Sequence, residues 1–277
     1  MMSETVSNSP KMKRLLSRVR EASSRTKLNV IAFSGGVDST VVAAAVHRTF
    51  PENSVACIAK SPSLSKDQLR RARDVAKHVG IQLMEVSTFE NLDPEYIANQ
   101  GSSCYVCKTN LYETLKSVSS YARDLEGDVV LFNGTNADDR LDPTRLGLVA
   151  AKEFDVCSPL DHAKKSKVRE IARFMGLPNA DVAASPCLRS RLALGVEATN
   201  HHLRFIDDAE SFVRNTLELE PERNMRVRLL PKNRIAIELD REMLRKAQNN
   251  LEQKFRCEFE EYSDVEIREY KYGSVSV

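Results

Sequence analysis

The most constraining feature of this sequence is a buried strand that runs directly into a glycine turn and then into a helix. Residues 29–33 form a short apolar run, as in a fully buried strand, and Ser34-Gly35-Gly36 follows at once. A helix is predicted from about Asp38, because apolar residues then recur on one face. The two glycines allow a tight turn and a close approach of the backbone to a ligand. Free amide groups and the helix dipole at this point favour a bound anion.

The same pattern continues along the first two thirds of the chain. Short apolar runs alternate with amphipathic helical stretches from residue 28 to about residue 177, which predicts an α/β fold with a doubly wound parallel sheet. Ligands of such sheets bind at the carboxyl ends of the strands, where the glycine turn lies. The predicted strands are 28–33, 54–59, 81–86, 129–133 and a short one at 156–158, and the predicted helices are 38–49, 66–78, 105–125, 146–153 and 165–175.

The pattern changes after residue 177. Residues 178–199 contain Pro178, Pro186 and Gly195 without any periodicity, and we interpret them as a linker or functional loop. Residues 200–277 predict a smaller C-terminal α+β domain with an antiparallel sheet. The first domain is then 1–177, with the loop at 178–199. The last domain has predicted helices at 200–217 and 242–255 and predicted strands at 225–230, 235–240 and 264–270.

Composition gives no argument for two classes of partner, membranes and nucleic acids. Of the 277 residues, 42% are apolar and 29% are charged, the formal charge is +2, and no apolar run reaches the length of a membrane span. We therefore expect no membrane partner and no nucleic acid. Six cysteines without a secretory signal suggest reduced thiols and a cytoplasmic location.

The N-terminal segment is basic and has two interpretations. Met12, Leu15, Leu16 and Val19 recur at helical spacing, which predicts a helix packed on the first strand. A signal that directs the chain to an organelle is the alternative.

Hydroxyl and carboxylate side chains follow the glycine turn. Ser39 and Thr40 add hydroxyl donors. Asp38 would repel a phosphate directly, so we interpret it as a ligand of Mg²⁺ or as a capping group of the helix. No lysine follows the glycines at the place that a Walker loop requires.

A second polar stretch, residues 133–139, also follows a predicted strand. Its Thr135, Asn136 and Asp138 are candidates to bind adenine, ribose or a metal ion. The alternative is an Asx-type turn that caps the next helix.

Cys187 carries the strongest signal of a reactive cysteine. Arg189 and Arg191 follow it in a polar loop, and nearby positive charge favours the nucleophilic thiolate. Cys104 and Cys107 form a Cys-x-x-Cys pair at the start of a predicted helix, which fits a redox pair, half of a zinc site or part of an iron–sulfur ligand set. The cysteines predicted to be packing residues are Cys57, Cys157 and Cys257.

Two resemblances rest on these motifs. The run Ser34–Ser39 resembles the PP-loop of ATP pyrophosphatases, which have an adenine nucleotide alpha hydrolase-like fold and split ATP between its α and β phosphates. With the Gly-Thr-Asn-Ala-Asp-Asp run from Gly134 and the Ser-Pro-Cys-Leu run around Cys187, the chain resembles the LarE-type ATP-dependent sacrificial sulfur transferases almost from end to end. The residues expected to bind ATP or pyrophosphate are Ser34, Gly35, Gly36, Val37, Asp38, Ser39, Thr40, Thr135, Asn136 and Asp138.

The resemblance implies a two-step reaction in the synthesis of a nickel-pincer cofactor. The LarE-type family uses ATP and Mg²⁺ to adenylylate a carboxylate of a pyridinium mononucleotide, a small-molecule substrate. The cysteine that matches Cys187 then displaces AMP, and elimination leaves the sulfur on the substrate and dehydroalanine on the protein. Other members hold a cluster such as [4Fe–4S] on three cysteines, which Cys104, Cys107 and Cys187 match. Cys187 is therefore either the sulfur donor or a cluster ligand.

Four arginines are candidates to bind the phosphate of the substrate. Arg226 and Arg228 alternate along one predicted strand and so face the same side. We expect them to clamp the phosphate together with Arg189 and Arg191, and a solvated basic face is the alternative. Glu238 on the following strand is expected to bind Mg²⁺ or a second subunit of a homo-oligomer.

The sequence departs from the LarE-type pattern at a few places. Leu229 and Leu230 stand where a His-Gly is expected, and Leu146 stands where a proline is expected before Gly147. These differences affect the phosphate pocket and the subunit contacts and leave the ATP site intact. Two other functions stay open: a PP-loop enzyme that forms amides or thiolates tRNA, and a nucleotide-binding protein without turnover.

Overall fold

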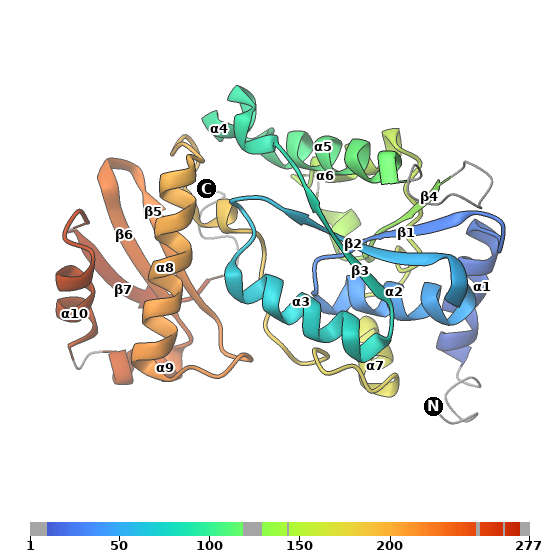
Figure 1. Cartoon of the computed structure of the whole chain (residues 1–277). Helices are drawn as coiled ribbons and strands as arrows, with labels where there is room; N and C mark the ends of the chain where they lie inside the picture. Colours follow the sequence, from blue (N-terminus) through green and yellow to red (C-terminus); the bar gives the residue numbers. More distant parts are fainter. Residues whose placement is uncertain (1–9, 119–128, 143, 248–249, 263, 272–277) are drawn as a thin grey trace. The chain divides into compact units, whose positions relative to one another are not determined.

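Strand β1 (Leu28–Ala32) lies inside a parallel sheet of four strands. The computed structural model describes residues 10–118, 129–142, 144–247, 250–262 and 264–271 (Figure 1). The sheet has the order β3-β2-β1-β4, with β2 at Ser54–Lys60, β3 at Gln82–Ser87 and β4 at Val129–Phe132. The strand predicted at 156–158 is reduced to a single parallel bridge between Phe132 and Cys157.

The order of the strands creates a switch point beside β1. From β1 the chain moves outward to β2 and β3, and then returns to β4 on the other side of β1. Ile31 pairs with Phe132, so β1 and β4 end next to each other. Open α/β sheets bind ligands at the carboxyl ends of strands that flank such a switch. The glycine turn follows β1 and the polar stretch 133–139 follows β4, so both lie at this point.

Helices cover both faces of this sheet, which confirms the doubly wound fold (Figure 1). On one face lie α2 (Val37–Thr49), α3 (Lys66–Val79) and α7 (Lys165–Phe174). On the other lie α5 (Ser103–Ser117) and α6 (Gly147–Glu153). Residues 119–125 of the helix predicted at 105–125 fall outside the described residues. The apolar core under α5 and α6 includes Val30, Val55, Cys57, Leu111, Tyr112, Leu115, Leu131 and Ala150.

The N-terminal helix predicted from apolar spacing is α1 (Pro10–Ala22). Its four predicted core residues, Met12, Leu15, Leu16 and Val19, are all buried. The helix packs against α2, whereas the prediction placed it on the first strand; α2 itself covers that part of the sheet. In the residues that the structure describes, no helix has the length and apolar character needed to cross a membrane.

The chain divides into two compact units whose limits differ from a simple cut along the sequence. The first unit comprises Met1–Ser61, Asp67–Glu90 and Cys104–Asp181. The second comprises Pro62–Lys66, Asn91–Ser103 and Val182–Val277, and it contains the short helix α4 (Pro94–Ala98). The predicted loop 178–199 is therefore shared between the two units, and its first residues belong with the parallel sheet.

The second unit is built on a mixed sheet of three strands. Strands β5 (Met225–Leu230) and β6 (Arg234–Leu239) are antiparallel, as predicted, but β7 (Val265–Glu269) runs parallel to β6. The parallel pair is possible because two helices, α9 (Arg241–Ala247) and α10 (Leu251–Glu258), form the crossover between β6 and β7. These two helices replace the single helix predicted at 242–255.

Helix α8 (Asn200–Leu217) covers one face of this sheet, and its ends follow from its sequence. At its start, Thr199 accepts a hydrogen bond from the backbone N of His202 at 3.1 Å, as an N-cap residue does. At its end, Glu218 adopts the left-handed conformation with φ 49°. Leu203, Ile206 and Val213 are fully buried because they recur on the face that packs against β5.

Candidate active site

The glycine turn follows β1 with a geometry that only glycine accommodates. Gly35 has φ +71°, and a Cβ at this position would meet the Cα and Cβ of Ala72 on α3 at 2.9 Å. Gly36 is the N-cap of α2 and makes no side-chain cap bond. The amides in the first turn of a helix have no acceptor within that helix, so this turn offers them to an anion.

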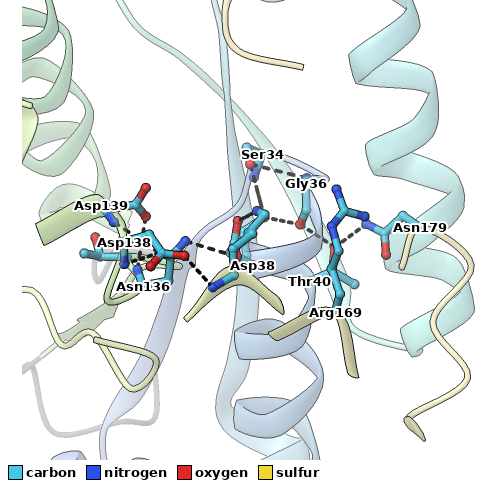
Figure 2. A network of polar contacts seen from close by, with 12 residues as sticks. Ser34, Gly36, Asp38, Thr40, Asn136, Asp138, Asp139, Arg169 and Asn179 are labelled. Atoms are coloured by element: carbon cyan, nitrogen blue, oxygen red, sulfur yellow. Dashed lines mark hydrogen bonds and ion pairs between the residues drawn. The ribbon is translucent and has the colours of Figure 1, made fainter. Parts of the chain in front are cut away.

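Two hydroxyl groups of α2 hold the turn in this shape (Figure 2). Ser39 Oγ and Thr40 Oγ1 both donate to the carbonyl oxygen of Gly36, at 3.0 and 2.9 Å. Ser39 Oγ also accepts from the backbone N of Ser34 at 3.2 Å. The two hydroxyls predicted as phosphate donors therefore also fix the backbone of the loop.

Asn179 is a residue of this site that sequence reasoning missed. Its Nδ2 donates to Gly35 O at 2.8 Å and to Thr40 Oγ1 at 2.9 Å, and the residue is only 6% exposed. Its Oδ1 is buried and has no hydrogen-bond partner in the described part of the chain. Asn179 follows α7 in a stretch without periodicity, so no pattern in the sequence marked it.

The segment after β4 contacts the start of α2 through Gly134. A Cβ on Gly134 would lie 2.6 Å from Ser39 N and 2.8 Å from Asp38 C, so no other residue fits there without a shift of the backbone. Asn136 nearby is 3% exposed, and its Oδ1 accepts from the amide of Asp138 at 2.9 Å. This is the Asx-type turn that was the alternative for this stretch. The same side chain also donates from Nδ2 to Asp38 Oδ1 at 3.4 Å, so the turn and the glycine loop are joined.

An ion pair between Asp38 and Lys165 completes this cluster. Lys165 Nζ donates to Asp38 Oδ2, and the backbone N of Lys165 donates to Asp138 Oδ2 at 2.8 Å. The carboxylate of Asp38 thus binds Lys165 and Asn136, and it does not cap α2, which was one of its two predicted roles. Sequence reasoning also missed Lys165, for which a lysine at the first position of the predicted helix 165–175 was the available signal.

The donors at this edge fit a magnesium ion held together with phosphates. Mg²⁺ prefers carboxylate oxygens and is usually bound by one or two of them plus phosphate oxygens and water. Asp38 and Asp138 both contact Lys165, and the side chain of Asp38 is 20% exposed and so reachable from solvent. Asp38, with Asp138 beside it, would hold the ion here.

Cys187 lies in the second unit, at the start of the short 3-10 turn Leu188–Arg191. Its thiol is free and half-buried. Arg191 is 1% exposed and donates from Nη1 to the carbonyls of Pro186 at 2.7 Å and Cys187 at 3.2 Å. Glu210 on α8 holds this guanidinium, with an Nε–Oε1 distance of 2.9 Å. The backbone that carries the thiol is therefore anchored by a buried ion pair.

Arg226 and Arg228, both on β5, bind the same segment. Arg226 donates to the carbonyl of Ala184, and Arg228 donates from Nη1 to the carbonyl of Ser190 at 3.0 Å. The two residues are 3% and 5% exposed. The arginines predicted to clamp a substrate phosphate thus bind backbone carbonyls around Cys187, so the structure assigns them a positioning role.

The carboxylate of Glu238 is enclosed by arginines. It is 0% exposed and accepts from Arg228 Nε at 2.7 Å and from Arg268 Nη2 at 2.8 Å. This differs from the predicted role as a ligand of Mg²⁺ or a subunit contact, because two adjacent guanidinium groups disfavour a divalent cation.

Charge within this buried cluster shifts two pKa values. Burial lowers the pKa of Arg226 to about 10, and the like charge of Arg191 acts in the same direction. Burial alone would raise the pKa of Glu210, but the charge and hydrogen bonds of Arg191 hold it below its usual value. Glu210 is thus an ionised counter-ion.

The other predicted site residues, Arg189, Cys104 and Cys107, lie in different parts of the chain's structure. Arg189 Nη1 donates to Asn99 Oδ1 at 2.7 Å, away from the Arg191 cluster. Cys104 and Cys107 lie one turn apart at the start of α5, in the first unit. No three His, Cys, Asp or Glu side chains are grouped as a metal site in the parts of the chain that the structure describes, so a cluster on Cys104, Cys107 and Cys187 stays a prediction.

Of the cysteines predicted to pack, Cys57 is in the core, where burial raises its pKa to about 12. Cys157 is half-buried. Cys257 is exposed, because the buried face of α10 is formed by Leu251 and Phe255.

The sequence of the first unit matches a known protein family. The model of the NAD synthase family covers residues 10–189, which include the glycine turn, Asp38, Lys165 and Asn179. The chain belongs to this family. Its PP-loop members use ATP, typically with Mg²⁺.

Three relatives illustrate the range of the family. The chain is 39% identical over 209 residues to an uncharacterised protein of Synechocystis sp., which covers 73% of this chain and 76% of that protein. It is 29% identical over 189 residues to the pyridinium-3,5-bisthiocarboxylic acid mononucleotide synthase of Lactiplantibacillus plantarum, with 67% and 66% covered. It is 28% identical over 201 residues to one subunit of the glutamine-hydrolysing GMP synthase of Methanopyrus kandleri, with 68% and 63% covered. The chain thus spans just under two thirds of the length of the last two proteins.

Proposed function

We propose that this protein is an ATP-dependent, AMP-forming sulfur transferase that converts a carboxylate of a small nucleotide into a thiocarboxylate, in the synthesis of a nickel-pincer cofactor. The observation that carries the proposal is Cys187. Its free thiol lies on a segment whose backbone carbonyls are held by three buried arginines, in a chain that also has a PP-loop. The similarity to the mononucleotide synthase of Lactiplantibacillus plantarum supports the choice of substrate.

In the first step, a carboxylate oxygen of the substrate attacks the α-phosphorus of ATP, and pyrophosphate leaves. The amides in the first turn of α2 and the ammonium of Lys165 offset the negative charge that builds up on the phosphates. Mg²⁺ on Asp38 would supply further neutralisation of charge. The product is an acyl adenylate.

In the second step, the thiolate of Cys187 attacks the acyl carbon, and AMP leaves with the electron pair of the broken C–O bond. A base then removes the Cα proton of Cys187. The electrons of that C–H bond form the Cα–Cβ double bond, and the Cβ–Sγ bond breaks with its electrons on sulfur. The products are a thiocarboxylate and dehydroalanine at position 187, so each chain reacts once.

Intact mass tests this proposal. The protein is incubated with ATP, Mg²⁺ and pyridinium-3,5-dicarboxylic acid mononucleotide, and pyrophosphate, AMP, thiocarboxylate and protein mass are followed. We expect the loss of one H₂S equivalent per chain, located at Cys187 by peptide analysis. Cys187→Ser should still release pyrophosphate and form no thiocarboxylate. Cys257→Ser, at an exposed cysteine of the same unit, should behave as the wild type.

Two other outcomes would change the proposal in defined ways. An unchanged mass with thiocarboxylate formed, an iron–sulfur absorption band, and loss of activity in Cys104→Ser would make the three cysteines the ligands of a sulfur-supplying cluster. Amide formation from ammonia, with Cys187→Ser fully active, would favour a second candidate, an ammonia-dependent amide synthetase, which the similarity to the GMP synthase of Methanopyrus kandleri supports. Release of neither pyrophosphate nor AMP would contradict both enzymatic functions.

A further inference from the structure

A cavity of about 290 Å³ lies between α1, α7 and the turn that precedes α7, apart from the residues assigned to ATP. Its walls come from three separate parts of the first unit. Helix α1 contributes Lys11, Arg14 and Leu15, and α7 contributes Lys167 and Ile171. The turn between them contributes Leu160, His162, Ala163 and Lys164.

The rim of this cavity is strongly positive. Four side chains on it, Lys11, Arg14, Lys164 and Lys167, carry a positive charge at neutral pH. Two carboxylates lie near them. Glu170 binds both Lys11 and Lys167, and Asp161 lies beside His162 and pairs with Arg18. Hydrogen bonds from these two lysines lower the pKa of Glu170 to about 2. Among the described residues, two carboxylates against these four cations leave a net positive charge around the cavity.

The floor of the cavity is apolar. Leu15, Leu160, Ala163 and Ile171 line it, and each is less than a tenth exposed. An inorganic ion alone would bury none of this apolar surface. A ring or short chain placed there would add about 25 cal/mol of favourable binding free energy for each Å² of apolar surface removed from water. His162 adds a polar atom, because its Nδ1 is buried and has no hydrogen-bond partner among the described residues; Asp161 Oδ1 lies 3.7 Å away.

We propose that this cavity binds a small organic anion, that is, a phosphate or carboxylate group carried on a compact apolar body. The anionic group would contact the cations of the rim, and the apolar body would lie on Leu15, Leu160 and Ile171. The volume fits such a molecule, because it is at the lower end of the range of small-molecule sites, about 300 to 1,000 Å³. The inference does not depend on sulfur transfer.

The turn that forms one wall of this cavity also reaches the PP-loop. The carbonyl of Ala163 accepts from Ala137 N at 2.9 Å, within the polar stretch after β4. Lys164, on the rim, directly precedes Lys165, which binds Asp38. An anion in the cavity would thus stabilise the same turn that supplies a cation to the ATP site.

Binding of phenyl phosphate to the full-length protein, measured by calorimetry, tests the proposal. Saturating ATP and Mg²⁺ are present, so that the PP-loop does not bind the probe. We expect Arg14→Glu and Lys167→Glu to weaken binding by about tenfold or more, since each removes a charged partner and adds repulsion. Lys13→Glu makes the same charge change on α1 at a residue that does not line the cavity, and should leave affinity within about twofold of wild type.

The control ligands define the chemical class. Inorganic phosphate and benzyl alcohol, each of which has only one half of the probe, should both bind more weakly than phenyl phosphate. Benzoate compared with phenyl phosphate then shows whether a carboxylate or a phosphate is preferred, and saturable binding of either one supports the site. No saturable binding of either anion, equal weakening by Lys13→Glu and Arg14→Glu, or inorganic phosphate as tight as phenyl phosphate would overturn the proposal.

Discussion

The side-chain amide of Asn179 supports the glycine turn from a point 144 residues further along the chain. It binds one backbone carbonyl of the turn and one hydroxyl of α2. Because both acceptors are close to the predicted phosphate site, Asn179 sets the curvature of the loop before any nucleotide binds. The role is structural, and the proposed binding of ATP depends on it, because the first-turn amides of α2 keep their direction only while the turn keeps its shape.

Replacing Asn179 with alanine should lower the free energy of unfolding by about 1–3 kcal/mol, since it leaves buried polar groups without partners. Urea unfolding of the purified protein measures this change. Asn91→Ala removes a more exposed contact to Asn200 and should cost much less. Equal losses in the two variants would show that the contacts of Asn179 with the turn contribute little.

Lys165 is the second residue whose effect we expect to be large. Lys165→Met keeps the apolar stem and removes the charge, so Asp38 loses its cation and the phosphates lose a donor. By analogy with other preorganised charge donors, the rate of pyrophosphate release should fall by about 100-fold. Lys77→Met on α3 makes the same change away from the loop, and an equal rate in both variants would rule out a direct role for Lys165.

Residues of the candidate site that lie near a motif could be predicted from the sequence, and those supplied from far away could not. Asp38 and Asn136 follow predicted strands and were both named as candidates to bind ATP, and their side chains are in contact. Lys165 and Asn179 join them from segments 127 and 139 or more residues away along the chain. Such contacts depend on how helices pack on the sheet, which no local pattern in a single sequence encodes.

At the scale of elements, β5 has two buried faces with different functions. The strand packs on α8, and its Arg226 and Arg228 bind the segment of Cys187. The alternation of the two arginines was predictable from the strand pattern. Their partners were not, because an alternating basic pattern is the same for a solvated face and for a face covered by a loop.

The buried pair of Arg191 and Glu210 should be far more costly to break than an exposed pair of the same type. Arg191→Gln leaves Glu210 charged and buried, so we expect a loss of about 3–5 kcal/mol in the free energy of unfolding. Arg256→Gln breaks an exposed pair with Glu252 on α10, and should cost less than about 1 kcal/mol. Urea unfolding gives both values.

The rate at which iodoacetamide alkylates Cys187 provides a second measurement on the Arg191→Gln variant. If Arg191 holds the backbone of the Cys187 segment, its loss should change the alkylation rate under conditions in which the protein is still folded. A rate that is unchanged in Arg191→Gln, together with a normal stability, would contradict this positioning role.

Strands and helices were predicted well where burial dictates the pattern, and less well where distant pairing decides. All four strands of the parallel sheet were found, although only β1, β2 and β4 contain buried residues and none in β3 is buried. The parallel pairing of β6 and β7 was missed because it is set by a crossover and not by the strands themselves. The split between α9 and α10 was missed because Asn250, with φ 70°, starts a new helix in a stretch with continuous apolar spacing.

At the scale of the whole molecule, stability should depend on pH through two partly buried histidines. Burial is the largest cause that lowers the pKa of His47 and the pKa of His162. For His162 alone, the positive charges of Arg14 and Arg18 lower the pKa further. A lowered pKa means that the unfolded chain binds more protons than the folded protein below pH 6.5. The contribution of these two histidines to the free energy of unfolding is therefore complete above that pH. It is lost as the pH falls through their pKa values in the folded protein.

Thermal unfolding between pH 5 and pH 8 measures this dependence. The double variant His47→Gln/His162→Gln should show a shallower fall in melting temperature on the acid side than the wild type. His201→Gln, at an exposed histidine, is the matched control and should keep the slope of the wild type. A double variant with the slope of the wild type would show that other groups cause the acid sensitivity.

The close approach of α3 to Gly35 also limits how this protein can evolve. A methyl group at position 35 would collide with the Cα and the Cβ of Ala72, so the two positions cannot vary independently. In related sequences, any residue other than glycine at position 35 should appear only with a displaced α3, because the backbone of residue 72 is part of the collision. Position 72 should likewise accept nothing larger than alanine while the PP-loop is intact. Helix α3, which has no predicted role in the chemistry, therefore limits which residues the glycine turn can accept during evolution.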